Sequence, residues 1–373
     1  MEPIRFKPPL YEQRYEFVKS YIDTHKPKKV ADLGCSECSL LHKLKFRSCI
    51  QELVGVDIDE DILKRKGYTL TPLPVHYLDP LERPLTVTLY HGSVCEKDPA
   101  LLGLDLITCI ELIEHLVTED LEKFQDALFG FMAPDAVLIS TPNVEFNVLL
   151  SDNSRFRHPD HKFEWNRKEF QTWAMNMSRT YNYTVEFTGV GEAGPESQDV
   201  GYCSQIGIFT KNYMETEESI SNKKKYKGVY RSVLHVVYPS IQDERYLRKV
   251  VLTAALSHAE CIKANFLRNL FPEEDGDQTN MADNKDKPPV LSKWLPSLQT
   301  ATESNTRPPF LEGDAIHVPI ETLFAIPRVK ELCGSLDVLR NMMNGEITLS
   351  ADGSAIVYPL HVENDLDSDM SNG

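Results

Sequence analysis

Two carboxylates and an imidazole lie within five residues of one another: Glu111, Glu114 and His115. They directly follow residues 104–110, an apolar run that is typical of a buried strand. If a helical turn begins here, the three side chains project from one face of it, because positions three and four apart are neighbours on a helix. Carboxylate and imidazole groups together bind divalent cations. The run therefore predicts a metal site at the carboxyl end of a strand, where open α/β sheets bind their ligands.

A second segment, residues 155–168, is basic and aromatic and supplies further imidazoles. His161 lies there in the run Asp-His-Lys-Phe-Glu-Trp, and a histidine between an acid and a lysine in a loop has little to do in a core. We expect it to join the metal site. The alternative for the first run is an amphipathic helix start whose acids are stabilised by the helix dipole. The cations of this segment that we expect to contact phosphate groups are Arg155, Arg157 and Lys162.

A nucleotide-type cofactor site is indicated earlier in the chain. One apolar stretch ends in Asp32-Leu-Gly34, and the next ends in Asp57. In a doubly wound sheet the first turn lets the backbone approach the ligand, and the acid accepts hydrogen bonds from ribose hydroxyls. No second glycine follows Gly34 for a pyrophosphate, so S-adenosylmethionine fits better than NAD. Ser93, near the end of a third strand, is a candidate for the adenine, although such a serine is more often a cap.

The chain has 373 residues, of which 41% are hydrophobic and 26% charged, and a formal net charge of −16. This charge argues against a broad electrostatic surface for nucleic acid, so any such contact must be local. No apolar run is long enough to span a bilayer, and the first residues lack a secretory signal. Eight scattered cysteines suggest a reducing compartment such as the cytoplasm. The single pair Cys35 and Cys38 has no partner pair for structural zinc.

Strand and helix patterns alternate over residues 1–211 and predict one α/β domain with a largely parallel sheet covered by helices on both faces. The seven expected strands are 30–34, 53–59, 86–94, 104–110, 136–141, 184–190 and 204–211. Residues 212–271 form a mixed extension with a candidate strand at 229–238 and a candidate helix at 243–271. Residues 272–309 have the composition of a disordered linker. Residues 310–373 are a variable region with an acidic tail.

Several motifs in order resemble those of the Hua-enhancer-type small-RNA 2′-O-methyltransferases. They are Asp-Leu-Gly-Cys at 32–35, Glu-Leu-Ile-Glu-His at 111–115, Ser-Thr-Pro-Asn at 140–143 with Glu-Phe-Asn at 145–147, Asp-His-Lys-Phe-Glu-Trp at 160–165 and Val-Glu-Phe-Thr-Gly-Val-Gly at 185–191. The resemblance covers about residues 10–211. Because the motifs begin almost at the N-terminus, the layout resembles the animal branch that acts on Piwi-interacting RNAs. The chain departs at Ser36, where relatives often have glycine.

The resemblance implies the fold of a class I S-adenosylmethionine-dependent methyltransferase, with a Rossmann-like seven-stranded sheet. It implies one divalent metal, Mg or Mn, at the catalytic centre, with the four ligands Glu111, Glu114, His115 and His161. His158 is a competing histidine that ranks below His161, because it lies outside the matched motif. It also implies that S-adenosylmethionine contacts Asp57 and Ser93, beside the first-strand residues Asp32 and Gly34.

The implied reaction is methyl transfer to the 2′-hydroxyl of the 3′-terminal nucleotide of a single-stranded small RNA, which protects that end. A cation chelated by both terminal hydroxyls would lower the pKa of the attacking one. The implied partner is a Piwi/Argonaute-type protein that presents the RNA to a monomeric, cytoplasmic enzyme, with germ granules as one location. Two alternatives remain: a metal-dependent O-methyltransferase of small vicinal diols, and a non-catalytic scaffold of RNA-silencing complexes. All the motifs precede residue 212, so we expect residues 1–211 to carry catalysis.

Overall fold

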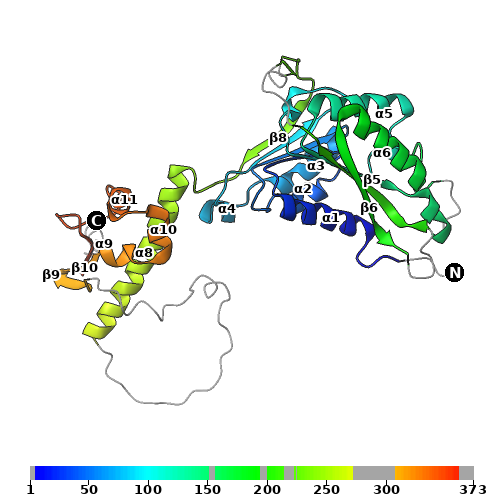
Figure 1. Ribbon diagram of the computed structural model, residues 1–373. Coiled ribbons are helices and arrows are strands. Elements are labelled where there is room, and N and C mark those ends of the chain that lie inside the picture. Colours follow the sequence, from blue (N-terminus) through cyan, green and yellow to red (C-terminus); the bar gives the residue numbers. More distant parts are fainter. Residues whose placement is uncertain are drawn as a thin grey trace, which may run out of the picture. The chain divides into compact units, whose positions relative to one another are not determined.

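Figure 1 shows a computed structural model of the chain, which describes residues 5–150, 156–193, 200–213, 222–223, 225–271 and 307–360. The chain forms two compact units, Met1–Ser240 and Ile241–Gly373. The acidic tail and all but the last three residues of the expected linker lie outside the described residues. In the part of the chain that is described, no helix has the length and apolarity needed to cross a membrane.

The first unit is built on a sheet of eight strands in the order β6-β7-β5-β4-β1-β2-β3-β8. The strands are β1 (Lys29–Leu33), β2 (Glu52–Asp57), β3 (Thr86–His91), β4 (Leu106–Ile110), β5 (Ala136–Pro142), β6 (Tyr183–Glu192), β7 (Tyr202–Lys211) and β8 (Arg231–Val237). Strands β1 to β5 run parallel, whereas β7 is antiparallel to β5 and β8 is antiparallel to β3. The carboxyl ends of the five parallel strands therefore meet at one edge of the sheet.

All seven expected strands are present, but the expected domain boundary after Lys211 is wrong. Strand β8 continues the sheet, since Thr86 at the start of β3 pairs with Val237 at the end of β8. The segment before β8 is also attached, because the Asp98 carboxylate accepts hydrogen bonds from the backbone N–H groups of Val229 and Tyr230, at 2.6 and 2.7 Å. The first domain therefore extends to about residue 240.

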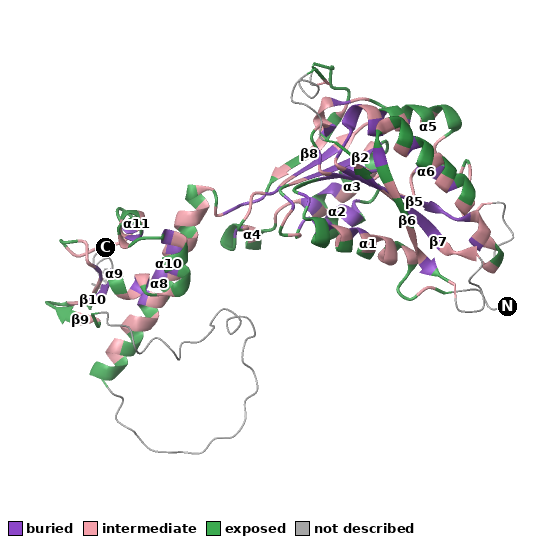
Figure 2. Ribbon diagram, viewed as in Figure 1, coloured by how far each residue is buried: buried purple, intermediate pink, exposed green. Residues whose placement is uncertain are grey.

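Helices cover both faces of this sheet. They are α1 (Leu10–His25), α2 (Ser39–Leu44), α3 (Glu60–Lys66), α4 (Pro74–Leu78), α5 (Thr118–Gln125) and α6 (Arg167–Tyr181). Neighbouring strand residues point to opposite faces, so Ile107 packs in the core with Phe170 of α6, and Leu106 packs in the core with Ile22 of α1. Figure 2 shows the buried strands between the partly exposed helices. The apolar side chains on the two faces of the sheet therefore pack in two separate cores.

The expected helix at 243–271 is α8 (Glu244–Leu270), but it belongs to the second unit and does not extend the first. The other elements of this unit are β9 (Phe310–Glu312), β10 (Ala315–Pro319), α9 (Ile320–Phe324), α10 (Pro327–Cys333), α11 (Leu336–Met343) and β11 (Ala355–Pro359). Val251, Ala255 and Ala259 of α8 lie four residues apart and pack on Val318 and Leu323. The described part of residues 310–360 is therefore a folded unit with its own apolar core.

Candidate active site

The candidate site begins where the chain leaves β4. Glu111, the next residue, has a φ of 52°, in the left-handed region that residues with side chains rarely adopt. A single 3₁₀ turn, Ile113–His115, follows. The prediction that Glu111, Glu114 and His115 share one helical face is therefore wrong, because the turn begins only after Glu111. The conformation of Glu111 depends instead on neighbouring strands.

Glu111 is held by groups from three other elements. Its backbone N–H donates to the carbonyl oxygen and to the Oγ of Ser140 in β5, both at 3.1 Å. Its carboxylate accepts from Ser140 Oγ at 2.9 Å and from Ser204 Oγ of β7, and it lies 3.4 Å from the guanidinium of Arg14 in α1. These contacts fix the first predicted ligand at the carboxyl edge of the sheet.

Glu114 is completely buried, which is unusual for a carboxyl group. Its Oε2 accepts a hydrogen bond from Thr141 Oγ1 of β5 at 3.0 Å. Its Oε1 is buried and has no hydrogen-bond partner among the described residues. Burial raises the pKa of Glu114 well above its usual value, and the charge of Glu111 raises it further. A buried oxygen without a partner is costly unless a ligand or a proton satisfies it.

Three imidazoles gather beside these acids. His115, His158 and His161 offer ring nitrogens that all lie within 4.8 Å of one another, and the rings of His115 and His161 are 4.9 Å apart. Burial lowers the pKa of His115, and the neighbouring His161 and His158 lower it further, so its neutral form is favoured. His161 Nδ1 lies 2.6 Å from the Glu164 carboxylate, which orients the ring and leaves Nε2 available. His158 belongs to this cluster, although the sequence ranked it lower.

The segment that carries His161 is anchored to the rest of the site. Glu164 accepts hydrogen bonds from the Asn147 side chain at 2.7 Å and from the backbone N–H of Arg157 at 2.6 Å. The backbone N–H of Lys162 donates to the carbonyl oxygen of Glu114 at 2.7 Å. The two histidine-bearing segments, which are far apart in the sequence, are thus hydrogen-bonded to each other directly.

The expected RNA-contacting cations have different surroundings. The Arg157 guanidinium donates to the backbone carbonyl oxygens of Cys203, at 2.8 Å, and of Asn143. Its charge is directed into the protein, and this contradicts the expected phosphate contact. The Lys162 side chain is exposed. Arg155 lies outside the described residues. Of the three expected contacts, Lys162 alone is described with a side chain that can reach solvent.

The residues that we expect to bind the cofactor lie at the same edge of the sheet. Asp32 at the end of β1 is buried and accepts a hydrogen bond from Thr108 Oγ1 of β4 at 2.7 Å. Burial raises the pKa of Asp32 to about 7; the hydrogen bond from Thr108 opposes this shift, and the charge of Asp57 adds to it. Asp32 is therefore a buried group that links β1 to β4 next to the first turn.

The first turn is tight, as the sequence predicts. Gly34 has a φ of 75°, and a Cβ there would lie 2.8 Å from Cδ1 of Leu112, which directly follows Glu111. Ser36 also adopts a left-handed φ, of 43°, where glycine would be unstrained. The Asp57 carboxylate accepts from the backbone N–H groups of Ser36 and Asp59, at 2.8 and 2.9 Å. The same acid thus fixes the first turn and the residues that follow β2.

Ser93 acts as a local cap. Its Oγ accepts a long hydrogen bond, 3.3 Å, from the backbone N–H of Cys95. Its carbonyl oxygen accepts from the hydroxyl of Tyr230 at 3.0 Å, and the Tyr230 ring lies where a Cβ of Gly92 would be. Tyr230 was not among the residues predicted from the sequence. It lies beyond the expected domain boundary at Lys211 and packs against Gly92 and Ser93, which follow β3.

Five residues of the site were not assigned roles from the sequence. They are Arg14, Ser140, Thr141, Glu164 and Ser204. One signal was available for two of them, because Ser140 and Thr141 are polar residues that end a wholly apolar strand. The ion pair of Arg14 and the hydrogen bond of Ser204 with Glu111 link segments that no local pattern connects.

Comparisons with known proteins cover both units. A family model described as the HENMT1 C-terminal domain matches residues 245–360. The chain is 58% identical over 368 residues to a small RNA 2′-O-methyltransferase of Xenopus tropicalis, covering 98% of this chain and 100% of that one. The corresponding protein of Gallus gallus is 46% identical over 363 residues, covering 97% and 96%. A crystal structure of the small RNA methyltransferase HEN1 matches with a TM-score of 0.54 and 33% identity, over 64% of this chain and 28% of that one.

Proposed function

Because the chain belongs to the small RNA 2′-O-methyltransferase family, we propose that it methylates the 2′-hydroxyl of the 3′-terminal nucleotide of single-stranded small RNAs. Its sheet is that of a class I S-adenosylmethionine-dependent methyltransferase, which confirms the expected fold and supports S-adenosylmethionine as the cofactor. The observation that carries the proposal is a cluster of three imidazoles at the carboxyl edge of the sheet, in segments that also hold two fixed carboxyl groups.

The donor set fits a divalent cation. Glu114 Oε1 is buried without a partner in the described structure, His115 favours its neutral form, and His161 keeps one nitrogen available. The four proposed ligands are Glu111, Glu114, His115 and His161, with His158 beside them. When bound, such a cation would supply the positive charge that makes a ribose hydroxyl acidic. Imidazole ligands favour Mn over Mg, whereas the carboxylates suit both.

The protein's own groups would do the remaining work. Asp57, fixed by two backbone N–H groups, would orient the cofactor ribose. Glu164 would hold the His161 ring in place. An imidazole of the cluster would accept the proton that the attacking 2′-hydroxyl loses as its oxygen bonds to the methyl carbon and the bond from carbon to sulfur breaks. Holding both reactants at one sheet edge makes the transfer effectively intramolecular, which lowers its barrier.

The proposed substrates are Piwi-interacting RNAs, presented in the cytoplasm by a Piwi/Argonaute-type protein. What supports this is the similarity to animal relatives over nearly the whole chain. A site that requires both terminal hydroxyls would exclude DNA, which lacks the 2′-hydroxyl, and RNA with a blocked 3′ end.

The test is transfer of a labelled methyl group to single-stranded small RNA, to the same RNA after periodate oxidation, to DNA of the same sequence and to a catechol. We expect label in the untreated RNA only, at its last nucleotide. Transfer to the catechol alone would support a small-diol methyltransferase. No transfer to any acceptor by protein that binds S-adenosylhomocysteine would contradict the proposed function.

The proposed metal site has its own prediction. Glu114→Gln preserves shape and the hydrogen bond from Thr141, so the fold should remain, while the loss of the charge should abolish Mn binding and methylation. His161→Ala should act in the same way. Binding of Mn measured by calorimetry separates this effect from activity, and Glu119→Gln, an exposed acid of α5, is the control. Unchanged Mn affinity in both variants would remove these residues from the metal site.

A further inference from the structure

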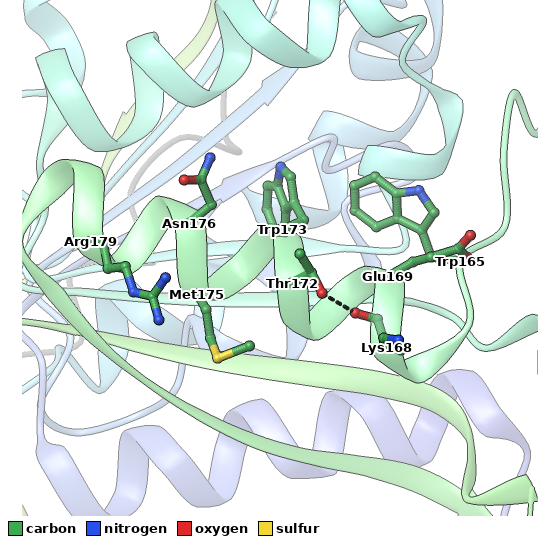
Figure 3. A pocket seen from close by; sticks show the side chains of 8 residues that line it. All are labelled: Trp165, Lys168, Glu169, Thr172, Trp173, Met175, Asn176 and Arg179. Carbon is green, nitrogen blue, oxygen red and sulfur yellow. Dashed lines mark hydrogen bonds between the residues drawn. The ribbon is translucent and has the colours of Figure 1, made fainter.

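A shallow groove of 590 Å³ runs along the outer face of α6 (Figure 3). Two neighbouring rows of side chains line it, all from α6 except Trp165, which lies just before the helix. One row contains Trp165, Trp173 and Asn176, and the other contains Lys168, Met175 and Arg179. An aromatic row thus lies beside a row that begins and ends in a cation.

We propose that this groove binds the substrate RNA on the 5′ side of the nucleotide that is methylated. The inference rests on the proposed function and extends it from the reacting nucleotide to the path of the strand. Single-stranded nucleic acids are bound without sequence preference where cations follow the phosphates and aromatic side chains contact the bases. The two rows of the groove present these two kinds of group side by side.

The cations of the groove are available for phosphates. Lys168 and Arg179 are exposed, and neither makes an ion pair in the part of the chain that is described. They are eleven positions apart, which is about 16 Å along a helix. Glu169, the acid of the groove, accepts a hydrogen bond from the backbone N–H of Asn166 and so caps the start of α6. In a chain of net charge −16, two uncompensated cations on one helix face indicate an anionic ligand.

The aromatic row is also prepared for a ligand. The ring centres of Trp165 and Trp173 lie 5.4 Å apart, and the ring of Phe163 stacks on Trp165 with the centres 4.3 Å apart. These contacts restrict the movement of both indoles. The Nε1–H of Trp173 is buried and has no acceptor among the described residues. An unsatisfied donor of this kind is rare in folded proteins, but because it is buried the faces and edges of the indoles, and not this N–H, are what the groove offers to bases.

The groove begins close in the chain to the segment that carries His161. Trp165 follows His161 by four residues, so the backbone between them spans at most about 14 Å. The Trp165 carbonyl oxygen accepts hydrogen bonds from Gln205 Nε2 at 3.0 Å and from the backbone N–H of Val144 at 3.2 Å, which anchors the indole at the end of β5. A strand whose last ribose lies among the histidines would therefore reach the groove within a few nucleotides.

The test compares a trinucleotide, which cannot fill the groove, with a longer single-stranded RNA. In the variant Lys168→Ala with Arg179→Ala, we expect the KM for the long RNA to rise about tenfold and its log–log salt slope to fall by about 1.4, at roughly 0.7 per lost phosphate contact. The KM for the trinucleotide should stay unchanged. Asn176→Lys adds a cation and should lower the KM for the long RNA. The matched control is Lys43→Ala with Arg65→Ala, two exposed cations of α2 and α3.

The outcomes separate this proposal from the proposed function. If the natural protein methylates neither RNA, the proposed function fails. If it methylates both, and the double variant has an unchanged KM and salt slope for the long RNA, the groove is not the RNA path. The groove would then belong to a protein partner if the double variant also loses binding to a Piwi-type protein while its RNA parameters stay unchanged. An equal rise in both KM values would indicate a disturbed active site and would also overturn the proposal.

Discussion

At the scale of single residues, Asp57 combines an observed role with a proposed one. It holds the first turn through the backbone N–H of Ser36, and as the last residue of β2 it is the proposed acceptor for the cofactor ribose. Asp57→Ala removes about two charge-assisted hydrogen bonds to the ribose, so the affinity for S-adenosylhomocysteine should fall by about 2–4 kcal/mol. Calorimetry measures this, with Asp61→Ala, an exposed acid of α3, as the control. Equal affinities in Asp57→Ala and the natural protein would show that the ribose acceptor is misassigned.

Asp32 makes the stability of the protein depend on pH. Burial raises its pKa from 3.8 to about 7, so the folded state holds a proton more tightly than the unfolded state does. Its contribution to stability is therefore complete below about pH 4 and is lost as the pH rises through 7. The corresponding free energy is at most about 4 kcal/mol, because each tenfold difference in proton affinity between the two states corresponds to about 1.4 kcal/mol.

Asp32→Asn cannot lose this proton, so its stability relative to the natural protein should increase between about pH 5 and pH 8. Thermal unfolding without cofactor at the two pH values measures the change, and Asp61→Asn is the exposed control. If the unfolding temperatures of Asp32→Asn and the natural protein change in parallel between the two pH values, Asp32 is already ionised in the fold.

The sequence motifs were enough to predict that His115 and His161 lie close together, and the backbone of Glu114 is hydrogen-bonded to the segment of His161. The motifs could not give the left-handed turn at Glu111, because that turn depends on Ser140 and Ser204, which come from other strands. A cation in a basic segment is also expected to be exposed. The Arg157 guanidinium instead donates hydrogen bonds to backbone carbonyl oxygens from other segments of the chain. The local sequence pattern indicates which residues belong to the candidate site. Hydrogen bonds between distant segments determine the directions of their side chains.

At the scale of elements, β8 shows the same limit. Buried strands such as β1 and β5 are continuous apolar runs and were predicted directly. Strand β8 is a half-exposed edge strand after a charged segment, and its place beside β3 depends on residues far away in the sequence. The sequence therefore indicated a possible strand there and could not assign it to the sheet.

Two truncations test the role of β8. A chain ending after Lys211 would leave the edge of β3 that faces away from β2 unpaired and would remove Tyr230 from Ser93. We expect it to aggregate or to unfold at a lower temperature. A chain ending after Ser240 keeps the whole sheet and should retain methylation of naked RNA. Equal stability and activity of the two truncations would show that β8 is dispensable.

At the scale of the whole molecule, two units with separate cores share one chain. Every motif residue lies in the first unit, so the chemistry predicted from the sequence is confined to that unit. The second unit was read as a variable region because its strands are short and its helices, apart from α8, have five to eight residues. Its core arises from contacts between α8 and segments beyond residue 310, which no local periodicity shows.

The pairing of β3 with β8 also has a consequence for the timing of biosynthesis. Strand β3 leaves the ribosome long before β8, and translation at about 5–20 residues per second separates them by roughly seven to thirty seconds. During that interval the nascent domain has an open edge at β3. Chaperones that shield strand edges would act in this interval, and a translational pause before codon 240 would lengthen it.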